Sequence, residues 1–217
     1  MSRKNTPSGG TDFYPTPAWC VDVIIPEVIK EIGRTVIARK SARQELGCIF
    51  EPGAGNGVIL ERVADALRPF GYDHFLGNEI DESFASDCEM RGMQMEVGDY
   101  LGMPKSSPVI DLVVMNPPYG GAMNTAQRFI DKAIREVCDG GAVFVLLRSS
   151  WLLDGAKRHG RTKWLKNDVG MPTKIFGLTR RPSFTGNNKT DGATYCWMMW
   201  RKGNFPKTIE YQILEVE

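Results

Sequence analysis

Short apolar segments alternate with helical segments from residue 48 onward, and this alternation restricts the possible folds more than any other feature. The apolar segments cover residues 48–51, 75–79, 93–97, 110–115, 142–147, 173–176 and 194–200. Helical patterns lie between most of them, at 57–69, 82–91, 124–138 and 155–167. Strands that are apolar on both faces are typical of a parallel sheet covered by helices on both sides. The last segment follows a Gly- and Asn-rich stretch instead of a helix. The sequence therefore predicts an α/β fold with a mostly parallel seven-stranded sheet and an antiparallel last strand.

The chain length fits one domain with a complete core. With 217 residues and no second composition block, residues 13–217 are expected to form a single domain. Residues 1–12 are polar and predict a flexible tail. A helix is expected over 17–32, with a kink or an early end at Pro26, followed by a loop or frayed helix over 33–47.

Several classes of protein are excluded by composition. The longest apolar runs, 142–147 and 195–200, are far shorter than the ~18 residues of a membrane span. The polar N-terminus does not resemble a secretory signal. The 5 cysteines occur singly and there are only 2 histidines, so the sequence predicts no metal site. Unpaired cysteines suit reduced thiols, and we expect a cytoplasmic protein.

Charge is distributed unevenly along the chain. The formal net charge is only +1, yet residues 148–207 carry 13 Lys/Arg and 3 Asp/Glu. Such a basic segment is either a solvated surface or the contact surface for a polyanion.

A glycine-rich turn follows the first predicted strand. Glu51 precedes Gly53, Ala54, Gly55 and Gly57. Glycines allow a tight turn and a close approach of the backbone to a ligand. The spacing differs from the GxGxxG of dinucleotide-binding proteins, and an acid before the glycines would repel a pyrophosphate. The turn instead suits a ligand with an ammonium or sulfonium charge.

Two further acids follow the next predicted strands. Glu79 ends its strand, where a carboxylate can accept both hydroxyls of a ribose, and Ile80 can cover an adenine face. Asp99, followed by Tyr100, can accept a hydrogen bond from an adenine amino group. Either acid alone is as consistent with an ordinary turn.

The most specific motif is Asn116-Pro117-Pro118-Tyr119, directly after the strand at 110–115. Two prolines remove two backbone donors, so nearby carbonyls are free to face a substrate. The Asn116 side-chain oxygen and the Pro117 carbonyl can both accept hydrogen bonds from one amino group, and Tyr119 offers a flat face.

These motifs, in this order, resemble class I S-adenosylmethionine-dependent methyltransferases, most closely the DNA N6-adenine methyltransferases of bacterial and phage type. The resemblance covers about residues 12–200. It implies that Tyr14, Pro15 and Thr16 close over the methionine end of the cofactor. It implies cofactor contacts from the glycine turn and from Glu79, Ile80, Asp99 and Tyr100, and catalysis by residues 116–119. The late segments 181–184 and 189–195 also resemble this family.

The chemistry implied by the resemblance is direct methyl transfer to an adenine amino group. Hydrogen bonds to Asn116 and Pro117 would localise the nitrogen lone pair and aim it at the sulfonium methyl. A base taken out of a duplex would stack on Tyr119. Phe184 is either a second wall for that base or a core residue.

The sequence contains no separate recognition domain. Phosphate contacts are expected from the basic segment, and a protein partner or residues 33–47 would have to supply any base reading. The candidate phosphate contacts are Arg148, Lys157, Arg158, Arg161 and Arg181.

Three other functions remain open. An RNA adenine methyltransferase would carry the same motifs. Protein-glutamine methyltransferases also use Asn-Pro-Pro-Tyr, but they have a helical domain ahead of the catalytic one, and here only 47 residues precede the first strand. A non-catalytic nucleic-acid-binding subunit would not need both the glycine turn and residues 116–119.

Overall fold

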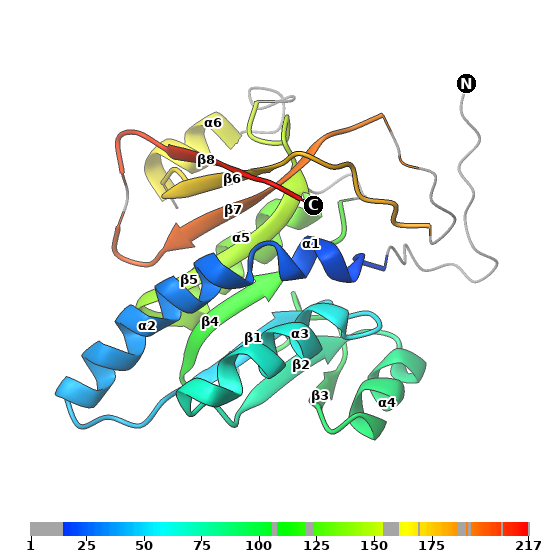
Figure 1. The fold of residues 1–217 in the computed structure, drawn as a ribbon, viewed down its shortest axis with the longest axis vertical. Coiled ribbons are helices and arrows are strands. Elements are labelled where there is room, and N and C mark those ends of the chain that lie inside the picture. The colour runs from blue at the N-terminus through cyan, green and yellow to red at the C-terminus, as the bar shows by residue number, and fades with distance from the viewer. Residues whose placement is uncertain are drawn as a thin grey trace.

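In the computed structural model, a single eight-stranded sheet carries helices on both faces (Figure 1). The structure describes residues 15–105, 108–119, 124–153, 161–168, 170–185, 190, 192–204 and 206–216. The strands are β1 (Cys48–Pro52), β2 (Phe75–Glu79), β3 (Gln94–Val97), β4 (Ile110–Met115), β5 (Val137–Arg148), β6 (Lys174–Leu178), β7 (Tyr195–Arg201) and β8 (Glu210–Leu214). The helices are α1 (Ala18–Asp22), α2 (Ile25–Ser41), α3 (Val58–Leu67), α4 (Glu82–Met90), α5 (Thr125–Glu136) and the short α6 (Arg161–Lys163). A 3-10 turn at Arg68–Phe70 follows α3, and a π-helical turn at Trp164–Asp168 follows α6.

The strand order is β3-β2-β1-β4-β5-β7-β6-β8. Strand β7 runs antiparallel to both of its neighbours, and the other pairs are parallel. The predicted α/β class and mostly parallel sheet are confirmed.

The prediction of seven strands with the antiparallel strand last is wrong. An eighth strand, β8, pairs in parallel with β6 at the edge of the sheet. Its sequence, Glu-Tyr-Gln-Ile-Leu, lacks the continuous apolar run of the central strands. Even its apolar residues Tyr211 and Ile213 are exposed. Apolar residues on both faces were the signal for the other strands, and an edge strand does not need them.

Two hydrophobic cores lie on opposite faces of the sheet. Along β4, Leu112 and Val114 face the core under α1, α2 and α3, whereas Val113 and Met115 face the core under α5. The same alternation continues through β5 and β7, because successive side chains in a strand point to opposite faces. This burial on both faces explains why the central strands are almost entirely apolar.

The N-terminal region forms two helices instead of one. Helix α1 ends at Asp22, and Pro26 lies in the first turn of α2, where its missing N–H costs no hydrogen bond. Helix α2 then continues to Ser41, through much of the segment expected to be a loop or a frayed helix. Its Arg39 donates to the buried Asp111 carboxylate near the start of β4, with Nε 2.7 Å from Oδ1. This ion pair attaches the last turns of α2 to β4.

The remaining expectations concern membrane spans, metal sites and the N-terminal tail. In the described part of the chain, no helix is long and apolar enough to cross a membrane. Nor do the described residues include a group of three or more His, Cys, Asp or Glu placed to hold a metal ion. The predicted tail at residues 1–12 lies outside the described residues.

Candidate active site

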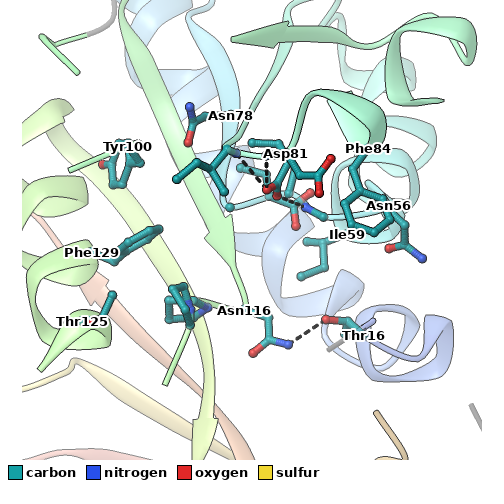
Figure 2. A pocket seen from close by; sticks show the side chains of 18 of the residues that line it. Thr16, Asn56, Ile59, Asn78, Asp81, Phe84, Tyr100, Asn116, Thr125 and Phe129 are labelled. Carbon is teal, nitrogen blue, oxygen red and sulfur yellow. Dashed lines mark hydrogen bonds between the residues drawn. The ribbon is translucent and has the colours of Figure 1, made fainter. Parts of the chain in front are cut away.

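A cavity of about 410 Å³ opens at the carboxyl ends of β1, β2 and β4 (Figure 2). Strand order reverses beside β1, since β2 and β3 lie on one side of it and β4 and β5 on the other. In open α/β sheets, ligands bind outside the carboxyl ends of the strands at such a reversal. Fourteen of the residues predicted to bind cofactor or substrate line this cavity: Pro15, Thr16, Glu51, Gly53, Ala54, Gly55, Glu79, Ile80, Asp99, Tyr100, Asn116, Pro117, Pro118 and Tyr119.

The glycine turn between β1 and α3 is built from left-handed backbone conformations. Gly53, Gly55 and Gly57 have φ of 67°, 53° and 71°, values that favour glycine. Gly57 does not line the cavity, although it was predicted to touch cofactor. It caps α3, and a Cβ at this position would lie 2.7 Å from Cys88 Sγ. Gly57 therefore shapes the turn from behind, while Gly53 and Gly55 face the cavity.

Glu51 places a buried carboxyl in the wall of the cavity. Only 2% of the residue is exposed, and its Oε2 accepts a hydrogen bond from the Leu60 amide at 2.8 Å. Burial raises the pKa of Glu51 well above its ordinary value, and the nearby Glu79 carboxylate raises it further. A cation bound here would favour the ionised form.

Glu79 is held in place by backbone donors. Its Oε2 accepts from the Gly55 amide at 2.7 Å, and its Oε1 accepts from the amides of Ile80 and Asp81 at 2.8 and 3.0 Å. The carboxylate thus connects the glycine turn to the end of β2. Each carboxylate oxygen has two lone pairs, so Oε2 retains acceptor capacity toward the cavity.

The loop after β3 carries the third acid. Asp99 is exposed, and its Oδ1 accepts from the Leu101 amide at 3.0 Å. Tyr100 is buried, donates its hydroxyl to Glu136 at 2.8 Å, and packs against Phe129 with ring centroids 5.0 Å apart. Lys132 Nζ donates to the Tyr100 carbonyl oxygen at 2.6 Å. These contacts with α5 fix the loop against the floor of the cavity.

The motif after β4 brings the N-terminal segment into the site. Asn116 Nδ2 donates to Thr16 Oγ1 at 3.0 Å, and the Tyr119 hydroxyl donates toward Asn116 Oδ1 at 2.7 Å. Figure 2 shows Thr16 and Asn116 joined at the edge of the cavity opposite Tyr100 and Phe129. The Tyr119 ring packs edge-on against Tyr195, with centroids 6.3 Å apart.

Three of the residues predicted to contact substrate, Phe184, Arg148 and Arg181, do not line the cavity. Phe184 is only 9% exposed and packs against Tyr195 at 4.9 Å, within the core under α1 and α3. Arg148 and Arg181 are exposed at or beyond the carboxyl ends of β5 and β6, the same edge of the sheet as the cavity. Tyr14, Lys157, Arg158 and the side chain of Arg161 lie outside the described residues.

Ten further residues line the cavity without having been predicted to do so. They are Asn56, Val58, Ile59, Asn78, Asp81, Phe84, Gly98, Leu101, Thr125 and Phe129. The clearest signal among them was Asn78, a polar residue inside an apolar strand. It is 2% exposed, and its Nδ2 donates to the carbonyl oxygens of Glu96 and Gly98 at 3.0 Å each. No local pattern marks Phe84 or Phe129, which come from α4 and α5.

Comparison with known proteins gives similarity in structure but not in sequence. Neither a protein-family profile nor a curated protein sequence matches this chain. Among solved structures, a Listeria monocytogenes protein assigned as a class I S-adenosylmethionine-dependent methyltransferase matches with a TM-score of 0.70 and 18% identity. The match covers 95% of this chain and 68% of that one.

Two other similar structures carry different methyltransferase descriptions. The methyltransferase subunit of a type I restriction-modification system from Streptococcus thermophilus matches with a TM-score of 0.64 and 17% identity. That match covers 92% of this chain but only 47% of the subunit, so this chain spans about half the subunit's length. A Pyrococcus horikoshii protein assigned as an RNA methyltransferase matches with a TM-score of 0.62 and 18% identity over 91% of each chain. The chain therefore has the Rossmann-like fold of the class I methyltransferases.

Proposed function

We propose that this protein is an S-adenosylmethionine-dependent methyltransferase that transfers a methyl group to the N6 amino group of adenine in DNA. The observation that carries the proposal is one cavity in which the acid-flanked glycine turn lies beside Asn116-Pro117-Pro118. The same cavity thus offers acceptors for a cationic cofactor and acceptors for an amino group.

The residues of the cavity fit this cofactor. A volume of about 410 Å³ lies in the range of small-molecule sites. Glu51 supplies a buried acid for the ammonium group, and Glu79 has a lone pair left for ribose hydroxyls. Ile80, which is 63% exposed at the cavity rim, offers an apolar face to an adenine ring. When bound, the cofactor supplies an electrophilic methyl group on a sulfonium.

The residues after β4 would then bind and orient the amino group. Asn116 Oδ1 and the Pro117 carbonyl oxygen accept hydrogen bonds from its two N–H groups, and these hydrogen bonds localise the nitrogen lone pair. Catalysis of this kind depends on positioning and on electrostatic complementarity, and it needs no proton abstraction before transfer.

DNA is favoured by the distribution of charge. The exposed Arg148, Arg180 and Arg181 lie at the sheet edge that carries the cavity. The basic segment 148–207 follows directly after β5 in sequence. The similarity to a restriction-modification methyltransferase subunit supports the same substrate.

RNA is the second candidate, supported by the similarity to a protein assigned as an RNA methyltransferase over 91% of each chain. Labelled S-adenosylmethionine offered with duplex DNA, single-stranded DNA, RNA and unmodified protein would separate the candidates. We expect label in DNA, recovered as N6-methyladenine after digestion to nucleosides. Label confined to RNA or protein would contradict the DNA assignment.

A matched pair of asparagine variants tests the site in that assay. Asn116→Ala should lower methyl transfer by about 100-fold or more, because the amino group loses its acceptor. Asn204→Ala changes an exposed asparagine that does not line the cavity and should leave transfer unchanged.

A further inference from the structure

The Asn116 side chain is held at both ends by hydroxyl groups from distant parts of the chain. Its Nδ2 donates to Thr16 Oγ1 at 3.0 Å, across 100 positions of sequence. Its Oδ1 lies 2.7 Å from the Tyr119 hydroxyl oxygen. An unrestrained carboxamide turns about its last side-chain torsion with little preference. Two contacts at opposite ends remove that freedom.

The Tyr119 hydroxyl has a second acceptor in the neighbouring strand. Its oxygen lies 2.6 Å from the Leu146 carbonyl oxygen of β5, as well as 2.7 Å from Asn116 Oδ1. A phenol has one proton, so it serves only one of these acceptors at a time. Burial raises the pKa of Tyr119 well above its ordinary value, so the proton stays on the oxygen at neutral pH.

The Tyr119 hydroxyl therefore cannot serve Leu146 and Asn116 Oδ1 at the same time. An incoming group that donates a hydrogen bond to Asn116 Oδ1 would leave the Tyr119 proton to Leu146. A group without a donor would displace water from the cavity and leave this oxygen unsatisfied, which costs about 1–3 kcal/mol for a buried group.

We propose that Thr16 and Tyr119 are positioning residues whose hydroxyls clamp the Asn116 carboxamide, with Oδ1 on the side of Tyr119, so that this oxygen is held ready for an acceptor group that donates a hydrogen bond. This inference rests on the proposed amino-methyltransferase function. It gives the Tyr119 hydroxyl a role separate from any contact of its ring with a base.

The geometry of the clamp can be tested without activity. Nitrogen-15 labelling of asparagine, with Asn116→Asp to identify the signal, reports hydrogen exchange at Asn116 Nδ2 by NMR. Thr16→Val should accelerate this exchange severalfold because it removes the acceptor of Nδ2. Thr16→Ser should restore slow exchange, and Tyr119→Phe should leave it nearly unchanged. Acceleration by Tyr119→Phe but not by Thr16→Val would mean that the carboxamide is reversed, and it would overturn the proposal.

The role in the reaction is tested by separating turnover from binding. Thr16→Val and Tyr119→Phe should each lower kcat at least about tenfold, because misplacement of the reacting groups is costly. The Kd for S-adenosylhomocysteine should change less than twofold in Tyr119→Phe, and Thr16→Ser should recover most of the kcat lost in Thr16→Val. Thr35→Val, a threonine of α2 outside this cavity, is the matched control for both readouts.

The Asn116→Ala background distinguishes a clamp from an independent role. If both hydroxyls act through Asn116, neither substitution should slow single-turnover transfer further in that background. Full kcat in Tyr119→Phe, or an undiminished further loss in the Asn116→Ala background, would overturn the proposal. If the wild-type protein transfers no methyl group to nucleic acid, the proposed function fails, and the exchange measurements still decide whether the carboxamide is clamped.

Discussion

At the scale of single residues, Glu51 is the side chain whose ionisation is most closely connected to ligand binding. Its carboxyl is almost fully buried in the cavity wall beside Glu79, and both burial and that neighbour favour its neutral form. A positively charged ligand would reverse this preference. Binding and proton release at Glu51 are therefore coupled.

We predict that S-adenosylmethionine binds more tightly as pH rises through the raised pKa of Glu51. Below that pKa the free protein holds a proton on Glu51 that the complex releases, so a rise in pH through this range favours the complex. Calorimetry in two buffers of different ionisation enthalpy measures the release directly. Glu51→Gln should weaken binding and abolish the release. Equal heats in both buffers for the wild-type protein would contradict the coupling.

Glu79 is expected to stabilise the protein as well as bind cofactor. Its carboxylate accepts three backbone amides, and Glu79→Ala would leave them without that acceptor. The loss is about 1–3 kcal/mol for each amide that water does not reach. We predict a lower free energy of unfolding in urea for Glu79→Ala, together with loss of cofactor binding. Glu79→Gln, which keeps one acceptor oxygen, should be less affected; an unchanged urea midpoint in Glu79→Ala would show that the amides find other partners.

At the scale of elements, one ion pair at the opposite end of the sheet anchors α2. Asp111 is fully buried, and Arg39 is only 12% exposed. The Asp111 Oδ2 also accepts from the Gly47 amide at 2.8 Å and the Tyr72 hydroxyl at 3.1 Å. One carboxylate of β4 thus joins α2 to the segments that precede β1 and β2.

We predict that Asp111→Ala lowers the free energy of unfolding by about 3–5 kcal/mol, because Arg39 would remain largely buried without its partner. The control is Asp65→Ala, which breaks an exposed pair with Arg68, whose side chains are 69% and 54% exposed. Its expected effect is below about 1 kcal/mol. Urea unfolding measures both, and similar losses for the two variants would contradict a buried anchor.

The elements also show where sequence reasoning succeeds. The limits predicted for β2 and β4 match the structure, because both strands are buried along their whole length, contain short apolar runs and are bounded by polar turns. Strand β5 begins earlier than predicted, at Val137, because Val137 pairs with Ile110 of β4 ahead of a register shift that skips residues 138–141. Strand β8 depends on an edge position that no local pattern reveals.

The same distinction applies to the candidate site. Glu79 and Asn116 were predicted to belong to the site because Glu79 ends a predicted strand and Asn116 opens a specific motif directly after another. Phe84 and Phe129 come from helices, and only the packing of those helices on the sheet places them in the cavity.

At the scale of the whole molecule, the uneven charge is expected to govern nucleic-acid binding. We predict that binding to duplex DNA weakens with salt, with a slope of log K against log [salt] of about −0.9 for each phosphate neutralised. Charge reversal at Lys157, Arg158 and Arg161 together should weaken binding and flatten this slope. It should leave the Kd for S-adenosylhomocysteine unchanged.

The control for that experiment reverses three cations of α2. Lys30, Lys40 and Arg43 are exposed on α2 or just beyond its end, on the helix that Arg39 anchors at the opposite end of the sheet. Their reversal changes the net charge equally and should have a smaller effect on the slope. A DNA-binding constant that does not change with salt in the wild-type protein, or equal effects of the two triple variants, would contradict a localised phosphate-binding surface.

The contacts of the N-terminal segment have a consequence for biosynthesis. The Thr16 hydroxyl accepts a hydrogen bond from Asn116. The carbonyl oxygen of Cys20 accepts a hydrogen bond at 2.8 Å from Trp197 Nε1, 177 positions later. On a ribosome, Thr16 and Cys20 emerge well before Asn116, and Asn116 emerges well before Trp197. Until β7 leaves the exit tunnel, α1 lacks the strand on which it docks. The wall of the cavity that Thr16 forms is therefore fixed in place only after residue 197 has been synthesised, long after the strands on the other side of the cavity have emerged.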